Sequence, residues 1–193
     1  MKDAILRKVR ESHEVGAQFF EQNAPALEAC ARALAERFSA GGRLFVVGNG
    51  GSACDAAHVA VEFVHPVVEK RRALPAVALA SDVASMTAIA NDQDYSAVFD
   101  RQLAVLAKRG DSVLGISTSG VSPNIVRALE RARSAGHLTI GFSGRDGGRM
   151  PDVCEHSFVV KTWSIHRVQE THTILLHLLW DLVHVAMGED DVL

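Results

Sequence analysis

Residues 112–124 have the sequence SVLGISTSGVSPN, which predicts a strand, a loop and the start of a helix in that order. The apolar run at 112–116 shows no polar alternation, as is typical of a strand buried on both faces. Pro123 stands where the first residue of a helix belongs, so Ser122 is the expected N-cap. Backbone N–H groups at a helix N-terminus, with several hydroxyls beside them, suit a phosphate. An ordinary serine-rich turn is the alternative explanation.

Four more short apolar runs repeat the strand pattern, and most of them are followed by a helical stretch. The predicted strands are 43–47, 76–79, 112–116, 138–142 and 157–160, and the helices that follow them are 53–65, 82–90, 123–135 and 165–187. Buried strands joined by helices indicate right-handed crossovers. We therefore predict an α/β fold, a flavodoxin-like three-layer sandwich with a five-stranded parallel sheet.

Residues 3–39 place apolar side chains at three- and four-residue steps, which predicts helix. Pro25 predicts that this region is two helices, with the break at Asn23 or Ala24. We found no linker or low-complexity tract, so residues 1–193 are expected to be one domain with residues 1–40 as an N-terminal helical extension.

Composition excludes several classes of protein. The net charge is -3 and the longest basic run is 70–72, so no nucleic-acid partner is expected. The most apolar stretch, 171–187, carries three histidines and an aspartate, which argues against a membrane partner. Three scattered cysteines without CxxC spacing indicate reduced thiols and a cytoplasmic location.

The segment GNGGS at 48–52 repeats the strand–loop–helix pattern. It lacks the GK[ST] of a phosphate-binding Walker loop and does not fit GxGxxG, so a dinucleotide is disfavoured. Its glycines allow a ligand to approach the backbone closely. Since ligands of such sheets bind at the carboxyl ends of the strands, the GNGGS and STSG loops are expected to share one phosphate site.

Histidines and a glutamate supply candidate chemistry. His58 and Glu62 are four residues apart in one predicted helix and therefore share a face. In the last helix, Gln169, His172 or Thr173, and His177 follow roughly one face. A carboxylate and an imidazole suit the proton transfers of aldose–ketose isomerisation, and the same groups suit a metal that polarises a carbonyl. A solvated helix pair and a core histidine are the plainer alternatives.

Several motifs together resemble one family. They are VVGNGGSACDAAHVAVEF, AIANDQDY, GISTSGVSPNIVRAL, SGRDGG and RVQETHTILLH, and the likeness runs from about residue 15 to 187. The chain resembles the phosphoheptose isomerase branch of the sugar isomerase (SIS) superfamily. The resemblance implies conversion of sedoheptulose 7-phosphate to D-glycero-D-manno-heptose 7-phosphate. It also implies a homo-oligomer, commonly a tetramer with active sites between subunits, and in some members one zinc per subunit.

The resemblance also implies roles for individual residues. Glu62 matches the general base and His177 the general acid. The matching zinc ligands are His58, Glu62, Gln169 and His177. The matching substrate and phosphate contacts are Asn49, Gly50, Gly51, Ser52, Asp92, Ser117, Thr118, Ser119, Ser122 and Gln169. The N-terminal helices and the last helix are expected to bury the subunit contact through Leu175, Leu178, Leu179 and Trp180.

Two positions depart from the family pattern. Pro66 stands where many relatives have an arginine, and His166 where several have an acidic residue. These departures leave the exact sugar open, with Arg71, Arg72 and Arg167 as candidates to replace the lost contact. An isomerase for another ketose phosphate, a sugar-sensing domain and a non-catalytic binding protein, such as a replication-initiator partner, are the alternatives.

Overall fold

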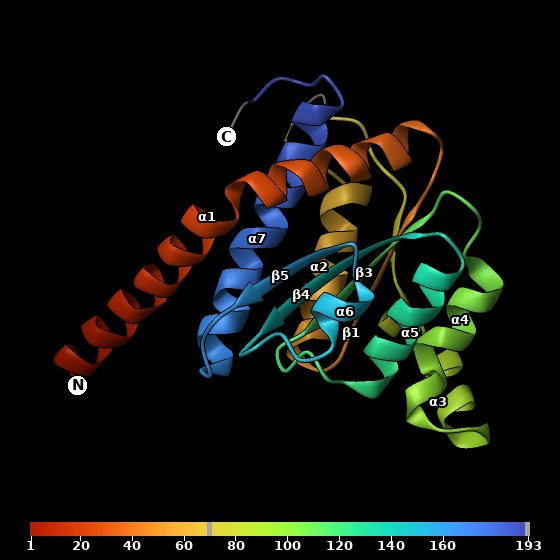
Figure 1. Cartoon of the computed structure of the whole chain (residues 1–193), viewed down its shortest axis with the longest axis horizontal. Coiled ribbons are helices and arrows are strands. Elements are labelled where there is room, and N and C mark those ends of the chain that lie inside the picture. Colours follow the sequence, from red (N-terminus) through yellow and green to blue (C-terminus); the bar gives the residue numbers. More distant parts are fainter. Residues whose placement is uncertain (69–70, 192–193) are drawn as a thin grey trace.

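Five short runs of mostly apolar residues form one parallel sheet (Figure 1). The strands are β1 (Leu44–Gly48), β2 (Ala76–Ala78), β3 (Ser112–Ser117), β4 (Leu138–Gly144) and β5 (His156–Val160). Their order is β2-β1-β3-β4-β5, and every neighbouring pair is parallel. The computed structural model describes residues 1–68 and 71–191, so Lys70 of the short basic run lies outside the described residues. The predicted fold class is confirmed.

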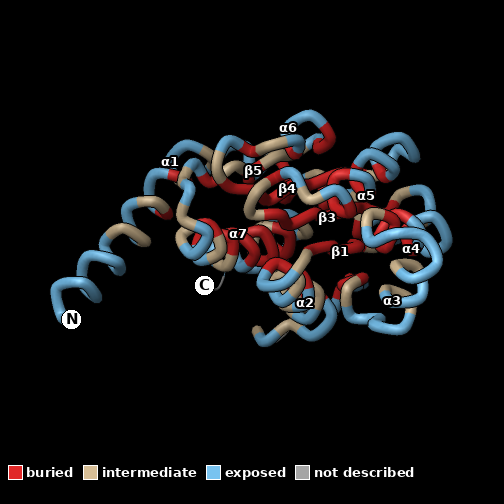
Figure 2. The backbone as a smooth tube through the Cα atoms, turned by 90° about the horizontal axis from the view of Figure 1, so that it is seen from below, coloured by how far each residue is buried: buried red, intermediate tan, exposed pale blue. Residues whose placement is uncertain are grey.

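Helices cover both faces of the sheet. One face carries α1 (Lys2–Ser39), α2 (Gly51–Val64) and α7 (Ile165–Ala186). The other carries α3 (Val83–Asp92), α4 (Val98–Leu106), α5 (Pro123–Ser134) and the short α6 (Met150–Val153), together with the 3-10 turns η1 (Leu79–Ser81) and η2 (Tyr95–Ala97). Side chains of a strand alternate between faces, so Leu44 and Val46 belong to one core and Phe45 and Val47 to the other. Figure 2 shows the buried residues gathered along the strands and α7.

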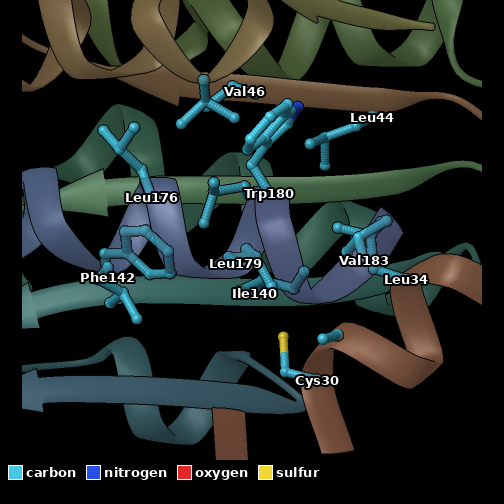
Figure 3. Packing of buried hydrophobic residues seen from close by; sticks show 14 of the residues in the cluster. Cys30, Leu34, Leu44, Val46, Ile140, Phe142, Leu176, Leu179, Trp180 and Val183 are labelled. Atoms are coloured by element: carbon cyan, nitrogen blue, oxygen red, sulfur yellow. The ribbon is translucent and has the colours of Figure 1, made fainter. Parts of the chain in front are cut away.

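Helix α7 packs its apolar face directly on the sheet (Figure 3). Leu175, Leu179 and Trp180 are almost fully buried there, whereas Leu178 keeps 37% of its surface exposed. The expectation that all four of these side chains form a subunit contact is therefore wrong for three of them. The apolar stripe of α7 faces the sheet of its own chain, and periodicity alone does not say which partner a stripe covers.

The N-terminal region is one helix, so the predicted break at Pro25 is wrong. Proline removes one backbone hydrogen bond, but Phe19 and Leu27 on either side of it are buried at 4% exposure. Packing on the body of the protein outweighs the local cost of the proline. The axis of α1 bends along its length, and its N-terminal part projects from the sandwich (Figure 1).

Helix α4 is absent from the sequence-based assignment. Its buried residues are Val98, Phe99, Asp100, Gln102 and Leu103, a helical spacing interrupted by two polar residues. Asp100 is buried because it pairs with Arg127 and Arg131 of α5. A search for apolar positions alone therefore misses two of the five buried residues of this helix.

None of the helices in the described part of the chain combines the length and the apolar character that crossing a bilayer requires.

Candidate active site

Two loops meet at the point where the strand order reverses. Gly48 at the end of β1 pairs with Ile116 near the end of β3, so the GNGGS and STSG loops leave the sheet side by side. Helix α2 begins at Gly51 and helix α5 at Pro123, and both N-termini therefore lie at the carboxyl edge of the sheet. Such a switch point is the usual ligand site of an open α/β sheet. A side chain on Gly48 would collide with the backbone of Ser52, so glycine permits this immediate turn into α2.

The hydroxyls of the second loop face one another. Ser117 Oγ lies 3.1 Å from Ser122 Oγ and accepts a hydrogen bond from the Gly120 N–H at 3.2 Å. Ser119 Oγ accepts a long bond of 3.4 Å from the Val121 N–H. Ser122 is the N-cap residue, as predicted, but its side chain makes no capping bond. Its hydroxyl is turned towards the loop, where it is placed to meet a ligand together with Thr118, which is half-buried.

A pair of asparagines joins the two loops. Asn49 Nδ2 donates to Asn124 Oδ1 at 2.9 Å, and Asn124 Nδ2 donates to Asn49 Oδ1 at 2.8 Å. The Tyr95 hydroxyl of η2 lies 3.0 Å from the same Asn49 oxygen. Asn49 was a sequence-based candidate, whereas Asn124 and Tyr95 were not. The first turn of α5 and η2 carry no local pattern that links them to residue 49.

His58, Glu62 and His177 come together between α2 and α7. His58 Nε2 lies 3.3 Å from Glu62 Oε1 and 3.2 Å from His177 Nε2, and the two imidazole rings are 4.8 Å apart. Helical periodicity predicted the pairing of His58 with Glu62. Their convergence with His177, 119 residues further along, comes from the packing of α2 on α7.

The geometry of this cluster fits a metal ion. The three ligand atoms lie within 4.8 Å of one another. Ligands about 2.1 Å from a tetrahedral zinc are separated by about 3.4 Å, close to the two shorter separations found here. Two imidazole nitrogens and a carboxylate oxygen are also ligand types that zinc prefers.

Gln169, the fourth expected ligand, contacts the GNGGS loop. A side chain on Gly51 would collide with the Gln169 amide, whose Cδ would lie at 3.2 Å. Gln169 is two turns before His177 in α7, as Gly51 is two turns before His58 in α2. Its amide therefore lies at the GNGGS loop, two turns of α7 away from His177.

Two acidic residues near the site differ from expectation. Asp92 is exposed and accepts a hydrogen bond from Asn91, and within the described residues it makes no hydrogen bond to either loop.

Asp55, which the sequence analysis did not select, lies one turn before His58. Burial raises the pKa of Asp55, an effect that the nearby His58 opposes. Its Oδ2 is buried without a hydrogen-bond partner among the described residues.

His172 is a core residue. It is fully buried beside Phe142, and its ring lies 3.2 Å from the Ser143 carbonyl oxygen through Nε2. Burial lowers the pKa of His172 to about 4, although the bond to Ser143 acts in the opposite direction. Of the alternatives in the last helix, His177 faces His58 and His172 faces the sheet.

The three arginines proposed to replace the missing family contact are engaged elsewhere. Arg71 is buried, pairs with Asp181 and stacks 4.6 Å from the Trp180 ring centroid, so it is not free to reach a ligand. Arg72 pairs with Glu189 at 2.9 Å. Arg167 pairs with Glu170 at 2.8 Å and donates to the Lys8 carbonyl.

Comparison with known proteins identifies the family of this chain. The family model described as the SIS domain matches residues 9–144. The chain belongs to the SIS domain family. It is 44% identical over 188 residues to a phosphoheptose isomerase of Desulfovibrio desulfuricans, covering 97% of this chain and 90% of the relative. For a phosphoheptose isomerase of Thermodesulfovibrio yellowstonii the identity is 42% over 189 residues, with 98% and 94% covered.

A solved structure shows the same likeness. Phosphoheptose isomerase GmhA from Neisseria gonorrhoeae superposes with a TM-score of 0.88 at 30% identity, covering 94% of this chain and 97% of that one. The predicted resemblance and the prediction of an isomerase enzyme are thus confirmed.

The buried His172 should make stability fall in acid. Its folded pKa of about 4 lies below its ordinary 6.5, so the unfolded chain binds a proton that the folded chain refuses. Neutral His172 therefore contributes in full to the free energy of unfolding above pH 6.5. This contribution, on the order of 3 kcal/mol, is lost as the pH falls from 6.5 to 4. The free energy of unfolding, measured in urea at fixed protein concentration, should fall less steeply with falling pH in His172→Gln than in wild type. In His13→Gln, a change at an exposed residue, the free energy of unfolding should fall with pH as it does in wild type. Equal pH dependence in His172→Gln and wild type would contradict the role of His172.

Proposed function

We propose that this chain converts sedoheptulose 7-phosphate to D-glycero-D-manno-heptose 7-phosphate. The proposal rests on the convergence of His58, Glu62 and His177 in one cluster, together with the GNGGS and STSG loops at one edge of the sheet. Phosphoheptose isomerases similar to this chain over nearly its whole length support the choice of sugar. Pro66 and His166 make a panel of other ketose phosphates the necessary comparison.

The two loops would hold the phosphate. Ser52, Ser117, Thr118, Ser119 and Ser122 offer hydroxyls, and Gly50 and Gly51 offer backbone N–H groups, at the N-termini of α2 and α5. Oriented N–H groups and the helix dipoles stabilise an anion there without a lysine or arginine. The open-chain sugar would then extend past Asn49 and Gln169 towards the cluster, with Asp92 as a further contact.

Proton transfers by Glu62 and His177 would complete the reaction. Glu62 takes the proton from C1 of the ketose while the C2 oxygen gains a proton from His177, which gives an enediol. His177 then accepts the proton of the C1 hydroxyl, and Glu62 returns its proton to C2. The C1 oxygen is now the aldehyde oxygen and the C2 oxygen a hydroxyl, so both residues end in their starting states.

A zinc ion is the alternative to proton transfer by His177, because a ring nitrogen that binds a metal cannot also carry the proton. His58, Glu62 and His177 would hold it, with Gln169 as the fourth ligand if its amide turns from Gly51 towards the cluster. Bound zinc would polarise the sugar carbonyl and stabilise the negative charge that develops on its oxygen.

A homotetramer is also proposed, chiefly from the family resemblance, and a cytoplasmic location from the three scattered cysteines. A cavity of about 530 Å³ lies between α1 and α7, and its lining includes Phe20, Ala24, Leu178 and Leu182. The projecting part of α1 exposes further apolar side chains, Ile5, Leu6 and Val9. A second copy of the chain would cover these surfaces, since monomers rarely leave large contiguous apolar patches exposed.

Chemistry and phosphate binding should separate in two variants. Glu62→Gln should abolish exchange of the substrate C1 proton with solvent, while affinity for sedoheptulose 7-phosphate survives. Ser119→Ala should weaken that affinity by about tenfold, because a bond to a charged group is lost. The matched change Glu130→Gln, at an exposed residue of α5, should alter neither quantity. Full turnover by Glu62→Gln would contradict the base role, and a wild type inactive on every ketose phosphate would favour a binding protein.

The role of His177 can be separated by metal content. Because its Nε2 lies 3.2 Å from His58 Nε2 and within 4.8 Å of the Glu62 carboxylate, His177→Ala should lower both bound zinc and turnover, the latter by about two to four orders of magnitude. A chelator should have the same effect on wild type. Zinc measured by elemental analysis should stay at wild-type content in His13→Ala. A His177→Ala protein that keeps its zinc but loses turnover would assign His177 to proton transfer alone.

Assembly can be tested by light scattering at micromolar concentration, where wild type should have the mass of four chains. Leu178→Asp places a charge on the exposed part of the α7 surface and should reduce that mass. Val105→Asp makes the same kind of change on α4, across the sheet, and should leave it unchanged. A monomeric wild type would refute the tetramer.

A further inference from the structure

The bonds around Asn49 determine which of its amide atoms is the oxygen. The Ile125 backbone N–H can only donate, and it lies 3.1 Å from Asn124 Oδ1, so that atom must be the acceptor. Asn124 therefore presents its Nδ2 to Asn49, and the Asn49 atom that accepts this bond is Oδ1. The Tyr95 hydroxyl, 3.0 Å from the same oxygen, is consequently a donor.

An inventory of the Asn49 amide shows what it has left to offer. Both lone pairs of Oδ1 are occupied, one by Asn124 and one by Tyr95. One hydrogen of Nδ2 is donated to Asn124 Oδ1, and the other has no partner within residues 1–68 and 71–191. A ligand that reaches Asn49 can therefore meet only a hydrogen-bond donor, and the matching ligand group is an oxygen with a free lone pair.

We propose that Tyr95 is a positioning residue which, together with Asn124, holds the Asn49 amide as a hydrogen-bond donor to an oxygen of the phosphorylated sugar. The proposal rests on the proposed function of the site. Asn124 is buried at 2% exposure, and both of its amide atoms are used in the bonds to Asn49 and Ile125. Tyr95 contacts Asn49 through its hydroxyl, and in the positioning role its influence on a ligand passes through the amide.

A double-mutant cycle tests this path. Tyr95→Phe keeps the ring and removes the donor, and it should raise KM for sedoheptulose 7-phosphate by about three- to tenfold with kcat within about twofold. In an Asn49→Ala background the same change should have no further effect, because residues acting through one another are not additive. Thr87→Val removes a hydroxyl from α3 that bonds only within its own helix, and it serves as the matched control. Equal effects of Tyr95→Phe in both backgrounds, or none in wild type, would overturn the proposal.

A ligand-free measurement separates this proposal from the proposed function. Tyr95→Phe should shift the side-chain amide resonances of Asn49 in a ¹H–¹⁵N spectrum, and Thr87→Val should not. Unchanged Asn49 resonances in Tyr95→Phe would overturn the positioning role even if the isomerase is active. If the Asn49 resonances shift in Tyr95→Phe but the wild-type protein is inactive on every ketose phosphate, the positioning of Asn49 would stand and the proposed reaction would be rejected.

Discussion

The parallel pairing of β1 with β3 is the constraint on which the rest of the site depends. Parallel strands end at the same edge, and the pairing of Gly48 with Ile116 brings two loop–helix junctions together there. Two helix N-termini then lie at one edge of the sheet, and backbone N–H groups at helix N-termini favour an anion. A phosphate can be held in this way without a buried cation, whose desolvation would be costly in the free protein.

The reactive cluster depends on a different contact, the packing of α7 on the sheet and against α2. Trp180 and Leu179 lie within one turn of His177 and are almost fully buried, so they fix the rotation of α7 (Figure 3). That rotation turns His177 towards His58, and it turns His172 into the core. The hydrophobic core thus selects which histidine of the helix is available for chemistry.

Polar contacts connect the two parts of the site. Asn124 and Tyr95 hold Asn49, and Gln169 of α7 contacts Gly51 at the start of α2. Because these contacts are made between separate elements, the loop conformation and the position of α7 depend on each other. A ligand bound to the loops would therefore meet the cluster at a distance set by the protein interior, which is the pre-organisation that proton transfer requires.

Local pattern in the sequence was enough to predict the five strands, the loops that follow β1 and β3, and the shared face of His58 and Glu62, because these features arise within a few consecutive residues. Helical spacing also raised Gln169 and His177, with His172 or Thr173 as alternatives, and the family resemblance added Asn49 and assigned the roles. Only the tertiary structure showed that α1 continues through Pro25, that Leu175, Leu179 and Trp180 belong to the core, and that Arg71 is buried. It alone brought Tyr95 and Asn124 to Asn49. The physical reason is that burial and hydrogen bonding between distant segments depend on which surfaces meet, and periodicity along one segment does not contain that information.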